Sequence, residues 1–400
     1  MPEHRRGRAR WRVLIIGPTH DHLSVQRSRI PHEAGYDVYW YDFHGGTGAL
    51  AHDAPWVTEV IAAPGWSRAG RVGVALSLAW TVLRLQPCII HVHFALCAWF
   101  QAVLVSRFHP LIVTTMGGDI TFRPDFQWAL REPTGYLLRQ ADVVTVKSDH
   151  MTSVVRALGV DAHNIRRITW GMDLQQFRPG LDTAQLRWRL GLAEDALVLF
   201  SARALEPRAN VDVVVRAFAV AASDLPESAV LLVSEFHAVS EYACEIRQLT
   251  LDLGVSERVR FVGSVEYDDM PLYLCMSKAV VSATSSDGMP QTVYQAMACC
   301  TRVILSDIPE TRELVDAGCS AEVVGVRDVA SLAAAMRRVC QGDRNASDLA
   351  DDRALVVMLA NRAEQDAKLA AIYKELTSLT MRRRLLATWT ALFRAASGRG

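Results

Sequence analysis

The chain has 400 residues, half of them apolar, and its 43 Lys and Arg residues equal its 43 Asp and Glu residues in number. Because the formal net charge is zero, no global field attracts nucleic acid, and we expect no nucleic-acid partner. The length suggests two domains with large buried cores. None of the eight cysteines forms a C-x-x-C pair, so we predict a reducing, cytoplasmic environment and no zinc site.

Short apolar runs alternate with helical stretches along the first part of the chain. The runs that predict strands are Arg12–Ile16, Asp37–Tyr41, Ile89–His93, Leu111–Thr115, Val143–Val146 and Arg167–Thr169. Helical patterns between them include Ala98–Phe108 and Met151–Leu158. The apolar stretch Val72–Leu83 is too short to cross a bilayer. We expect it to be a buried strand or helix and predict no transmembrane segment.

A second series of strands and helices follows the first. Its predicted strands are Leu197–Ser201, Val230–Val233, Val259–Val262, Ala279–Ala283, Val303–Ser306 and Glu322–Val324. Its predicted helices include Val211–Ala222, Val239–Leu253, Gln291–Cys299 and Val329–Cys340. Strands without polar alternation, joined by helices, are typical of doubly wound parallel sheets. We predict two similar α/β domains at residues 1–172 and 173–360, then a helix at 361–380.

A basic amphipathic tail is predicted at residues 381–400. Its large apolar residues fall on one helical face, and arginines occupy the other; the apolar ones are Leu385, Leu386, Trp389, Leu392 and Phe393. This pattern suggests contact with an anionic membrane surface. Packing on the body of the protein or on a partner subunit explains the same pattern equally well.

The segment from Asp287 to Gln295 carries the most informative chemistry. A buried strand ends just before Asp287, and Pro290 suits the first turn of a helix. We expect the loop to present free backbone N–H groups at Gly288 and Met289, where anionic or hydroxyl-bearing ligands bind well. Asp287 can accept hydrogen bonds from sugar hydroxyls, and Gln295 can reach a ribose. An ordinary strand–helix turn with a capping Asp is the alternative.

This segment resembles the donor site of retaining GT-B glycosyltransferases, especially glycosyltransferase family 4 (glycosyl transferases group 1). The family pattern is roughly E-G-x-P-x-x-x-x-E-A-M-A, and here Asp287 and Gln295 stand at the two glutamate positions. Asp287 keeps the charge with a shorter reach, whereas Gln295 keeps only hydrogen-bonding capacity. The resemblance assigns donor binding to Gly17, Gly288, Met289, Gln291 and Gln295.

Phe200–Phe218 resembles the family segment G-R-x-x-x-x-K-G/N, with Arg203 at the arginine and Arg208 at the lysine. A leaving nucleoside diphosphate gains negative charge as the glycosidic bond breaks, so two fixed cations stabilise the transition state most. The forked guanidinium group suits phosphate. Solvated surface arginines are the alternative interpretation. Asn164–Pro179 resembles the segment that crosses between the domains, and we assign Asp173 a turn-forming role.

Three loops of the first domain are candidates for the acceptor side. Gln86–Ala95 resembles the family's P-D-x-V-H-x-H segment, and we place His91 and His93 on opposite faces, with His93 nearer the ligand-binding carboxyl end of the sheet. A satisfied structural histidine is an equally good interpretation.

Thr114–Ile120 resembles an H-G-x-D-type loop, in which Gly117 and Gly118 allow close backbone approach and Asp119 is a catalytic candidate facing the acceptor hydroxyl. The third loop runs from Gly17 to His20.

The resemblance implies a GT-B architecture: two Rossmann-like doubly wound domains face each other across a cleft, and a C-terminal helix crosses back to the first domain. It implies a hexosyltransferase-type enzyme that moves a sugar, with retention, from a nucleotide-sugar donor to a sugar or lipid-linked acceptor. Cell-surface polysaccharide or glycolipid assembly at the inner face of the membrane is the expected setting. Two alternatives stay open: a non-catalytic GT-B relative that acts as a binding or scaffold subunit, and a nucleotide-sugar epimerase.

No cofactor and no metal are expected. A G-x-G-x-x-G motif after the first strand, a P-loop and a D-x-D metal clamp are all missing from the sequence. The acidic pair Asp351-Asp352 is expected on a solvated surface.

Overall fold

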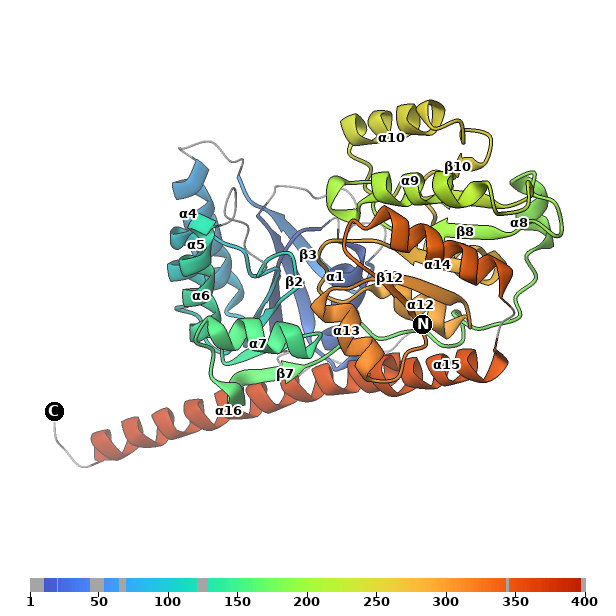
Figure 1. Cartoon of the computed structure of the whole chain (residues 1–400). Helices are drawn as coiled ribbons and strands as arrows, with labels where there is room; N and C mark the ends of the chain where they lie inside the picture. The colour runs from blue at the N-terminus through green and yellow to red at the C-terminus, as the bar shows by residue number, and fades with distance from the viewer. Residues whose placement is uncertain are drawn as a thin grey trace. The chain divides into compact units, whose positions relative to one another are not determined.

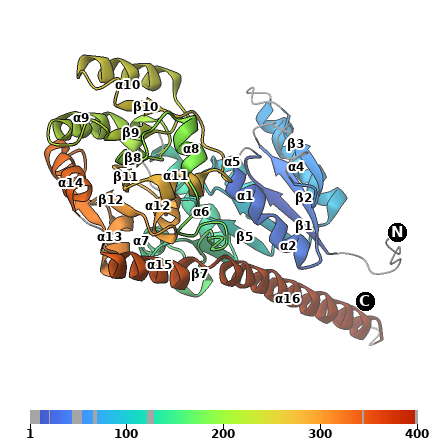
Figure 2. The same cartoon turned by 90° about the vertical axis from the view of Figure 1, so that its right-hand side faces the viewer.

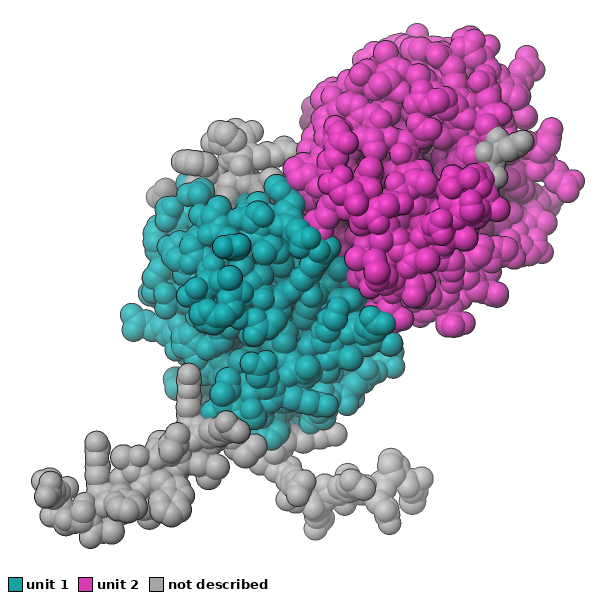
Figure 3. All heavy atoms as spheres, turned by 60° about the horizontal axis from the view of Figure 1, so that its bottom comes forward, with its two compact units in different colours: residues 1–170, 363–400 teal, residues 171–362 magenta. Residues whose placement is uncertain are grey.

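A computed structural model describes residues 11–19, 21–43, 54–64, 70–120, 128–342 and 345–396. The chain divides into two compact units. Unit 1 comprises Met1–Trp170 and Ala363–Gly400, and unit 2 comprises Gly171–Arg362 (Figure 3). This division falls two residues before the predicted one at 172 and assigns the chain after Arg362 to unit 1.

Unit 1 contains a sheet of seven parallel strands in the order β3-β2-β1-β4-β5-β6-β7 (Figure 1). The strands are β1 (Arg12–Ile16), β2 (Asp37–Asp42), β3 (Val57–Ala62), β4 (Ile89–His93), β5 (Leu111–Thr114), β6 (Val143–Val146) and β7 (Ile165–Arg167). Because the strand order reverses between β1 and β4, their carboxyl ends form the switch point where such sheets bind ligands.

Helices cover both faces of this sheet. They are α1 (His22–Arg27), α2 (Arg29–Glu33), α4 (Gly70–Leu85), α5 (Trp99–Val105), α6 (Arg131–Gln140), α7 (Asp149–Ala157) and α16 (Arg362–Ala396), with short 3-10 turns η1 (Trp128–Leu130) and η2 (Ala162–Asn164). Successive residues of a strand serve opposite cores. Leu14 and Ile16 pack in one core with α4 to α7, whereas Val13 and Ile15 pack in the other with α2 and α16.

Unit 2 contains a sheet of six parallel strands in the order β10-β9-β8-β11-β12-β13 (Figure 2). The strands are β8 (Val198–Ser201), β9 (Val230–Val233), β10 (Val259–Phe261), β11 (Ala279–Ser282), β12 (Arg302–Ser306) and β13 (Glu322–Val324). The helices are α8 (Ala184–Arg189), α9 (Val211–Ala222), α10 (Ser240–Asp252), α11 (Met270–Met276), α12 (Gln291–Ala298), α13 (Pro309–Asp316), α14 (Val329–Gln341) and α15 (Ala346–Ala360), with the 3-10 turn η3 (Pro207–Ala209). The predicted α/β class with two doubly wound parallel sheets is confirmed.

Two expectations for unit 1 are corrected. The strand expected at Arg167–Thr169 lies at Ile165–Arg167. The stretch Val72–Leu83, expected to be buried, forms α4 and is only half buried: Leu78 is 0% exposed, but Leu76 is 66% exposed. A helix that is apolar on every side gives no sequence signal of which side faces water. None of the helices in the described parts of the chain combines the length and the apolar character of a membrane-spanning segment.

The last helix, α16, is one continuous element that spans both the predicted helix and most of the predicted tail. Leu369, Ile372 and Leu376 are buried in the second core of unit 1. The hydroxyl of Tyr373 lies 2.6 Å from Nδ1 of His91 in β4. The other ring nitrogen of His91, Nε2, lies 2.7 Å from the hydroxyl of Thr114 in β5. The helix is therefore fixed to the sheet by apolar packing and by a buried polar chain.

The crossing segment follows the predicted pattern. Oδ1 of Asp173 accepts backbone hydrogen bonds from Gln175 and Gln176 at 3.0 and 3.2 Å, so its predicted turn-forming role is confirmed. Gly171 has a φ of +77°, and a Cβ there would lie 2.8 Å from the Cα of Arg362. Only glycine fits at this position without displacing backbone.

Gly171→Ala should destabilise unit 2 more than Gly180→Ala does. Both glycines have φ +77°, but a Cβ at Gly180 meets nothing within 4 Å. The left-handed backbone costs alanine about 1–2 kcal/mol at either position, and overlap with Arg362 should add roughly 1–3 kcal/mol at Gly171. Urea denaturation of both variants, followed by circular dichroism, measures the difference. Equal urea midpoints for the two variants would show that Arg362 moves away from the new methyl group at little cost.

His91 should make unit 1 sensitive to acid. Burial, with a smaller contribution from the charge of Arg27, lowers the pKa of His91 from 6.5 to about 3. Between about pH 3 and pH 6.5, the His91 side chain is therefore protonated in the unfolded chain but neutral in the folded chain. The contribution of neutral His91 to the free energy of unfolding should be fully present above about pH 6.5. Below that pH, the free energy of unfolding should fall by at most roughly 1.4 kcal/mol per pH unit.

His91→Gln should flatten this acid dependence, measured as the pH profile of the denaturation midpoint. His163→Gln is the matched control, because the His163 side chain is 74% exposed. Parallel pH profiles for wild type and His91→Gln would contradict the assignment.

Candidate active site

The candidate site in unit 2 lies where the strand order reverses. Strands β8 and β11 are parallel neighbours, so the loops that follow Ser201 and Ser282 leave the same edge of the sheet. The connection after β8 leads outward to β9, whereas β11 begins the other half of the sheet. Such a switch point is the usual ligand site of an open α/β sheet.

Arg203 and Asp287 meet across this boundary. Nη2 of Arg203 lies 2.6 Å from Oδ2 of Asp287, and both side chains are largely buried, at 17% and 11% exposure. The contact is a close ion pair without a well-aligned hydrogen bond, because Oδ2 and the Nε of Arg203 both lack hydrogen-bond partners. The prediction that both residues belong to one donor site is consistent with this geometry.

The other oxygen of Asp287 corrects one expectation. Oδ1 accepts the backbone N–H groups of Gly288 at 2.7 Å and Met289 at 3.2 Å. These two N–H groups were expected to be free for a ligand, but the short Asp side chain folds back on its own loop. Asp287 therefore shapes the loop while its second oxygen stays next to Arg203.

Buried polar atoms without a hydrogen-bond partner gather at the end of β11, in the two loops and at the start of α12. They are Nε of Arg203, Oγ of Ser282, Oδ2 of Asp287, Oε1 of Gln291 and Oγ1 of Thr292. Elsewhere in the described residues, only three buried side-chain polar atoms lack a hydrogen-bond partner, and they belong to Arg27, His93 and Arg337. Because an unsatisfied buried polar atom costs about 1–3 kcal/mol, such a concentration indicates a site built for a polar ligand. Gln295 lies one turn further along α12 and is also buried.

Arg208 is tied to the same loop through its backbone. Its carbonyl oxygen accepts the N–H of Ser285 at 3.1 Å and the hydroxyl of Thr284 at 3.2 Å. Its guanidinium donates to Oε1 of Glu206 from Nε at 3.1 Å and from Nη2 at 2.7 Å. Thus Arg208 lies beside the Asp287 loop, but its charge is held by Glu206 rather than by Asp287.

Asn210 is a site residue that sequence reasoning missed. It is 1% exposed with φ +52°, and its Nδ2 donates to the carbonyl of Ala283 and to Oγ of Ser285, both at 2.7 Å. It therefore joins the loop after β8 to the loop after β11. An Asn immediately before a helix, where left-handed backbone is tolerated, was the available signal.

The second switch point, in unit 1, brings Gly17 and His93 together. A Cβ on Gly17 would lie 3.0 Å from the Cβ of His93. His93 is 2% exposed, and its Nδ1 has no hydrogen-bond partner. Its ring lies 4.2 Å from that of His91, so the prediction of opposite faces is wrong: residues two apart on a strand share a face. Burial, aided by the neighbouring charges, lowers the pKa of His93 well below 6.5.

Asp119 requires a correction. It is 0% exposed, and its carboxylate accepts backbone N–H groups from Ala95 at 2.6 Å, Met116 at 2.8 Å and Gly117 at 2.9 Å. Burial raises its pKa, and these three hydrogen bonds and the charge of Lys147 oppose that rise. A carboxylate occupied in this way shapes the loop and does not face an acceptor hydroxyl.

The remaining acceptor-side candidates lie on or near this loop. Gly117 has φ +109° and is buried, whereas Gly118 is half-buried. His20 lies outside the described residues. Sequence reasoning also missed two buried cations: Lys147 and Arg27 lie 4.5 and 4.9 Å from the ring centroid of Trp170.

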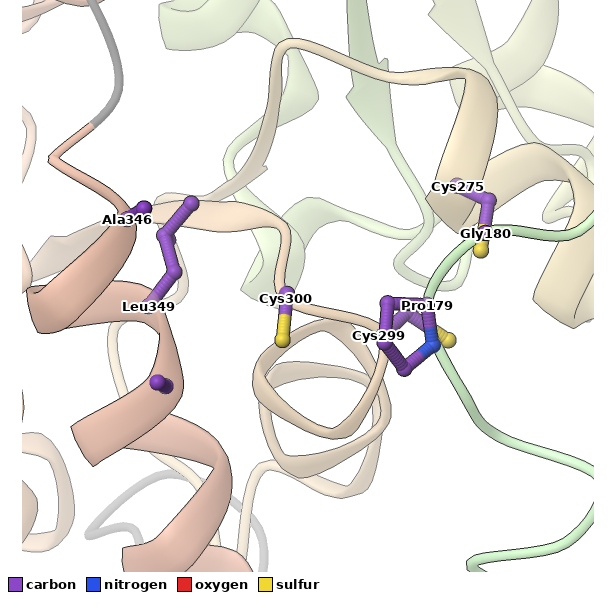
Figure 4. A pocket seen from close by; sticks show the side chains of 8 residues that line it. Pro179, Gly180, Cys275, Cys299, Cys300, Ala346 and Leu349 are labelled. Atoms are coloured by element: carbon purple, nitrogen blue, oxygen red, sulfur yellow. The ribbon is translucent and has the colours of Figure 1, made fainter.

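Two other features of unit 2 do not belong to the candidate site. A cavity of about 290 Å³ is lined by Cys275, Cys299, Cys300 and the start of α15 (Figure 4). Because α11 and α12 end there, it lies at the amino edge of the sheet, away from Asp287.

Asp352, expected on a solvated surface, is 1% exposed and accepts the N–H and hydroxyl of Ser320 at 2.8 and 2.6 Å.

Among the described residues, no group of three or more His, Cys, Asp or Glu side chains is placed to hold a metal ion.

Comparisons with solved structures support the fold. The chain is similar to sucrose-phosphate synthase from Thermosynechococcus elongatus, with a TM-score of 0.78 and 18% identity over 92% of this chain and 100% of that chain. It is also similar to Anabaena HepE in complex with UDP and glucose, with a TM-score of 0.76 and 17% identity over 92% and 100% of the two chains.

Comparisons of sequence point to the same kind of protein. D-inositol 3-phosphate glycosyltransferase of Geodermatophilus obscurus is 29% identical over 51% of this chain and 46% of that protein. A GDP-mannose-dependent α-(1-6)-phosphatidylinositol monomannoside mannosyltransferase of Mycolicibacterium smegmatis is 24% identical over 59% of this chain and 62% of that protein. The match thus spans about half the length of these curated relatives.

Two family models match consecutive parts of the chain. Residues 31–176 match Glycosyltransferase Family 4, and residues 182–353 match Glycosyl transferases group 1. These two matches fall on unit 1 and unit 2, whose sheets carry the two switch points. The chain therefore belongs to the GT-B glycosyltransferases of family 4, group 1.

Proposed function

We propose that this protein transfers a sugar from a nucleotide-sugar donor to an acceptor, with retention at the anomeric carbon. The observation that carries this proposal is the cluster of buried, unpartnered polar atoms around the Arg203–Asp287 ion pair at the switch point of unit 2. A nucleoside diphosphate linked to a sugar offers oxygens of both kinds that this cluster needs, anionic phosphates and neutral hydroxyls. HepE, which shares the fold, is described in complex with UDP-glucose.

The guanidinium group of Arg203 has two edges, and each is proposed to contact a different partner. Its Nη2 already lies next to Asp287, while its Nε has no partner and can donate to the diphosphate. One guanidinium then neutralises the leaving group and also orients Asp287 towards the sugar hydroxyls. Arg208 supplies a second cation, which Glu206 positions. Gln291 and Gln295 on α12 are proposed to bind the donor, with Gln295 at the ribose.

The reaction itself needs no nucleophile from the protein. The bond between the anomeric carbon and the phosphate oxygen breaks, the acceptor oxygen forms the new bond on the same face, and the acceptor proton passes to the departing diphosphate. Charge accumulates on the diphosphate in the transition state, where fixed cations act most strongly. The proposed chemistry uses no metal and no cofactor.

Unit 1 is proposed to bind the acceptor at its switch point, through Gly17, His93 and the Gly117–Gly118 loop. His93 can donate or accept one hydrogen bond there, because its Nδ1 has no partner. A lipid-linked sugar is the proposed acceptor class, and the Mycolicibacterium relative, named for a phosphatidylinositol mannoside, supports it. The basic residues 381–400 are proposed to contact an anionic membrane at the cytoplasmic face.

Arg203→Ala combined with Arg208→Ala should lower kcat by about 10²–10³-fold or more, because two charges that stabilise the leaving diphosphate are lost. The measurement is release of nucleoside diphosphate in the presence of acceptor. Arg338→Ala is the matched control, because Arg338 makes an equally close pair with Glu322 at 2.8 Å on another part of unit 2. Undiminished transfer by the double variant would refute the assignment.

Nucleoside diphosphates should raise the melting temperature of the purified protein, because a ligand that binds only the folded state stabilises it. A panel of diphosphates and nucleotide sugars would identify the base and the sugar. Gln295→Leu, which keeps the volume and removes the hydrogen bonds, should weaken binding by about tenfold. An unchanged dissociation constant would remove Gln295 from the ribose site.

A further inference from the structure

A third loop of unit 2 contacts the residues that join the other two. It is the turn at residues 325–328 between β13 and α14, closed by a hydrogen bond from the N–H of Asp328 to the carbonyl of Gly325 at 3.1 Å. The third residue of this turn, Arg327, has φ +58°. Glycine or asparagine normally occupies a turn position with such a left-handed backbone. An arginine at this position indicates that its side chain is in use, because residues in unusual backbone conformations gather at functional sites.

The guanidinium group of Arg327 binds two residues that follow β8. Its Nη1 donates to Oδ1 of Asn210 at 2.8 Å, and its Nη2 donates to Oδ2 of Asp212 at 2.9 Å. Asn210 is 1% exposed and has a left-handed backbone as well, with φ +52°. Two residues with this backbone conformation, 117 positions apart in the sequence, are therefore bonded side chain to side chain.

Asp212 and Tyr242 fix the position of the guanidinium group. The hydroxyl of Tyr242 in α10 donates to Oδ1 of Asp212 at 3.0 Å and accepts the backbone N–H of Asp212 at 3.0 Å. Burial raises the pKa of Tyr242 to about 12, so the hydroxyl keeps the proton that it donates at neutral pH. Asp212 thus uses one carboxylate oxygen for Tyr242 and the other for Arg327, and the forked guanidinium is held by two partners.

Arg327 determines which way the side-chain amide of Asn210 points. An Asn side chain has an acceptor oxygen and a donor NH₂ group, which exchange places when the amide turns over. Because Arg327 can only donate, it selects the orientation in which Oδ1 faces it. Nδ2 then donates to the carbonyl of Ala283 and to Oγ of Ser285, both at 2.7 Å. These two residues lie four and two positions before Asp287, so Arg327 acts on the Asp287 loop through Asn210.

We infer that Arg327 is a positioning residue for the transfer reaction: it orients Asn210, which in turn holds the loop that carries Asp287. The inference rests on the proposed function, because that proposal assigns Asp287 to the sugar. It extends the donor site to a third loop, the one that follows β13. Positioning of this kind affects rate strongly, since a misplacement of about 1 Å can slow a reaction by about a hundredfold.

Arg327→Gly removes the side chain and still suits the turn, because glycine adopts φ +58° without strain. The variant should unfold at a temperature close to that of wild type, but its kcat at saturating donor should fall by about tenfold. The melting shift caused by a nucleoside diphosphate alone should stay as in wild type, because Arg203 and Arg208 remain. Arg327→Lys should restore part of kcat, since an ammonium group can donate to Asn210 or Asp212 but lacks the fork.

The matched control is Arg338→Ala. The side chains of Arg338 and Arg327 are both 56% exposed, and each pairs with one carboxylate, at 2.8 and 2.9 Å. Arg338→Ala should keep the kcat of wild type. Hydrogen exchange followed by mass spectrometry tests the link without the reaction: backbone N–H groups of residues 283–289 should exchange faster in Arg327→Gly, and as in wild type in Arg338→Ala.

Asn210→Gly tests the route, because glycine also accepts the left-handed backbone at that position. If Arg327 acts through Asn210, adding Arg327→Gly to Asn210→Gly should lower kcat no further. Losses that multiply would overturn the inference. Unchanged exchange of residues 283–289 in Arg327→Gly would overturn it as well.

The same measurements separate the inference from the proposed function. A wild type that transfers sugar from no nucleotide sugar and shows no melting shift with nucleoside diphosphates would overturn the proposed function, and the positioning role with it. Transfer by wild type with an equal kcat in Arg327→Gly would count against the inference alone.

Discussion

The ion pair between Arg203 and Asp287 holds together the part of the molecule on which the proposed chemistry depends. It joins two loops that are distant in sequence and meet only because β8 and β11 are adjacent parallel strands. Asn210 reinforces the junction with two hydrogen bonds to the second loop. Buried central strands anchor the start of both loops. Groups held by such packing cost less to order during a reaction.

The two sheets present contrasting edges. In the described part of unit 1, Asp119 accepts three backbone N–H groups and His91 links β5 to α16, whereas Nδ1 of His93 has no hydrogen-bond partner. In unit 2 the equivalent edge leaves polar atoms on both loops without partners. A described edge with few such atoms suits an acceptor that is only positioned. An edge with unsatisfied polar atoms suits a charged donor that must be held strongly in the transition state.

Unit 1 combines two unusual helices. One face of α16 is buried through Leu369, Ile372 and Tyr373, so the last helix is part of the core of the first unit. In contrast, α4 carries four large apolar residues that are exposed: Val72, Leu76, Trp80 and Leu83. The first helix is explained by packing within the chain, whereas packing within the chain leaves these residues of the second helix exposed.

Periodicity alone determined the fold class and nearly every strand, because local propensity and burial pattern act over short distances. The resemblance to family 4 motifs, rather than periodicity, assigned Arg203, Asp287 and Gln295 to one donor site. Strand β3 was not predicted, because an edge strand that is only half-buried carries little pattern. Only the tertiary structure decided that Asp119 is enclosed, that Asp352 is buried, that Arg208 pairs with Glu206, and that one apolar face of α4 is exposed. These outcomes depend on which segments pack against each side chain, and no local sequence pattern encodes a neighbour that is distant along the chain.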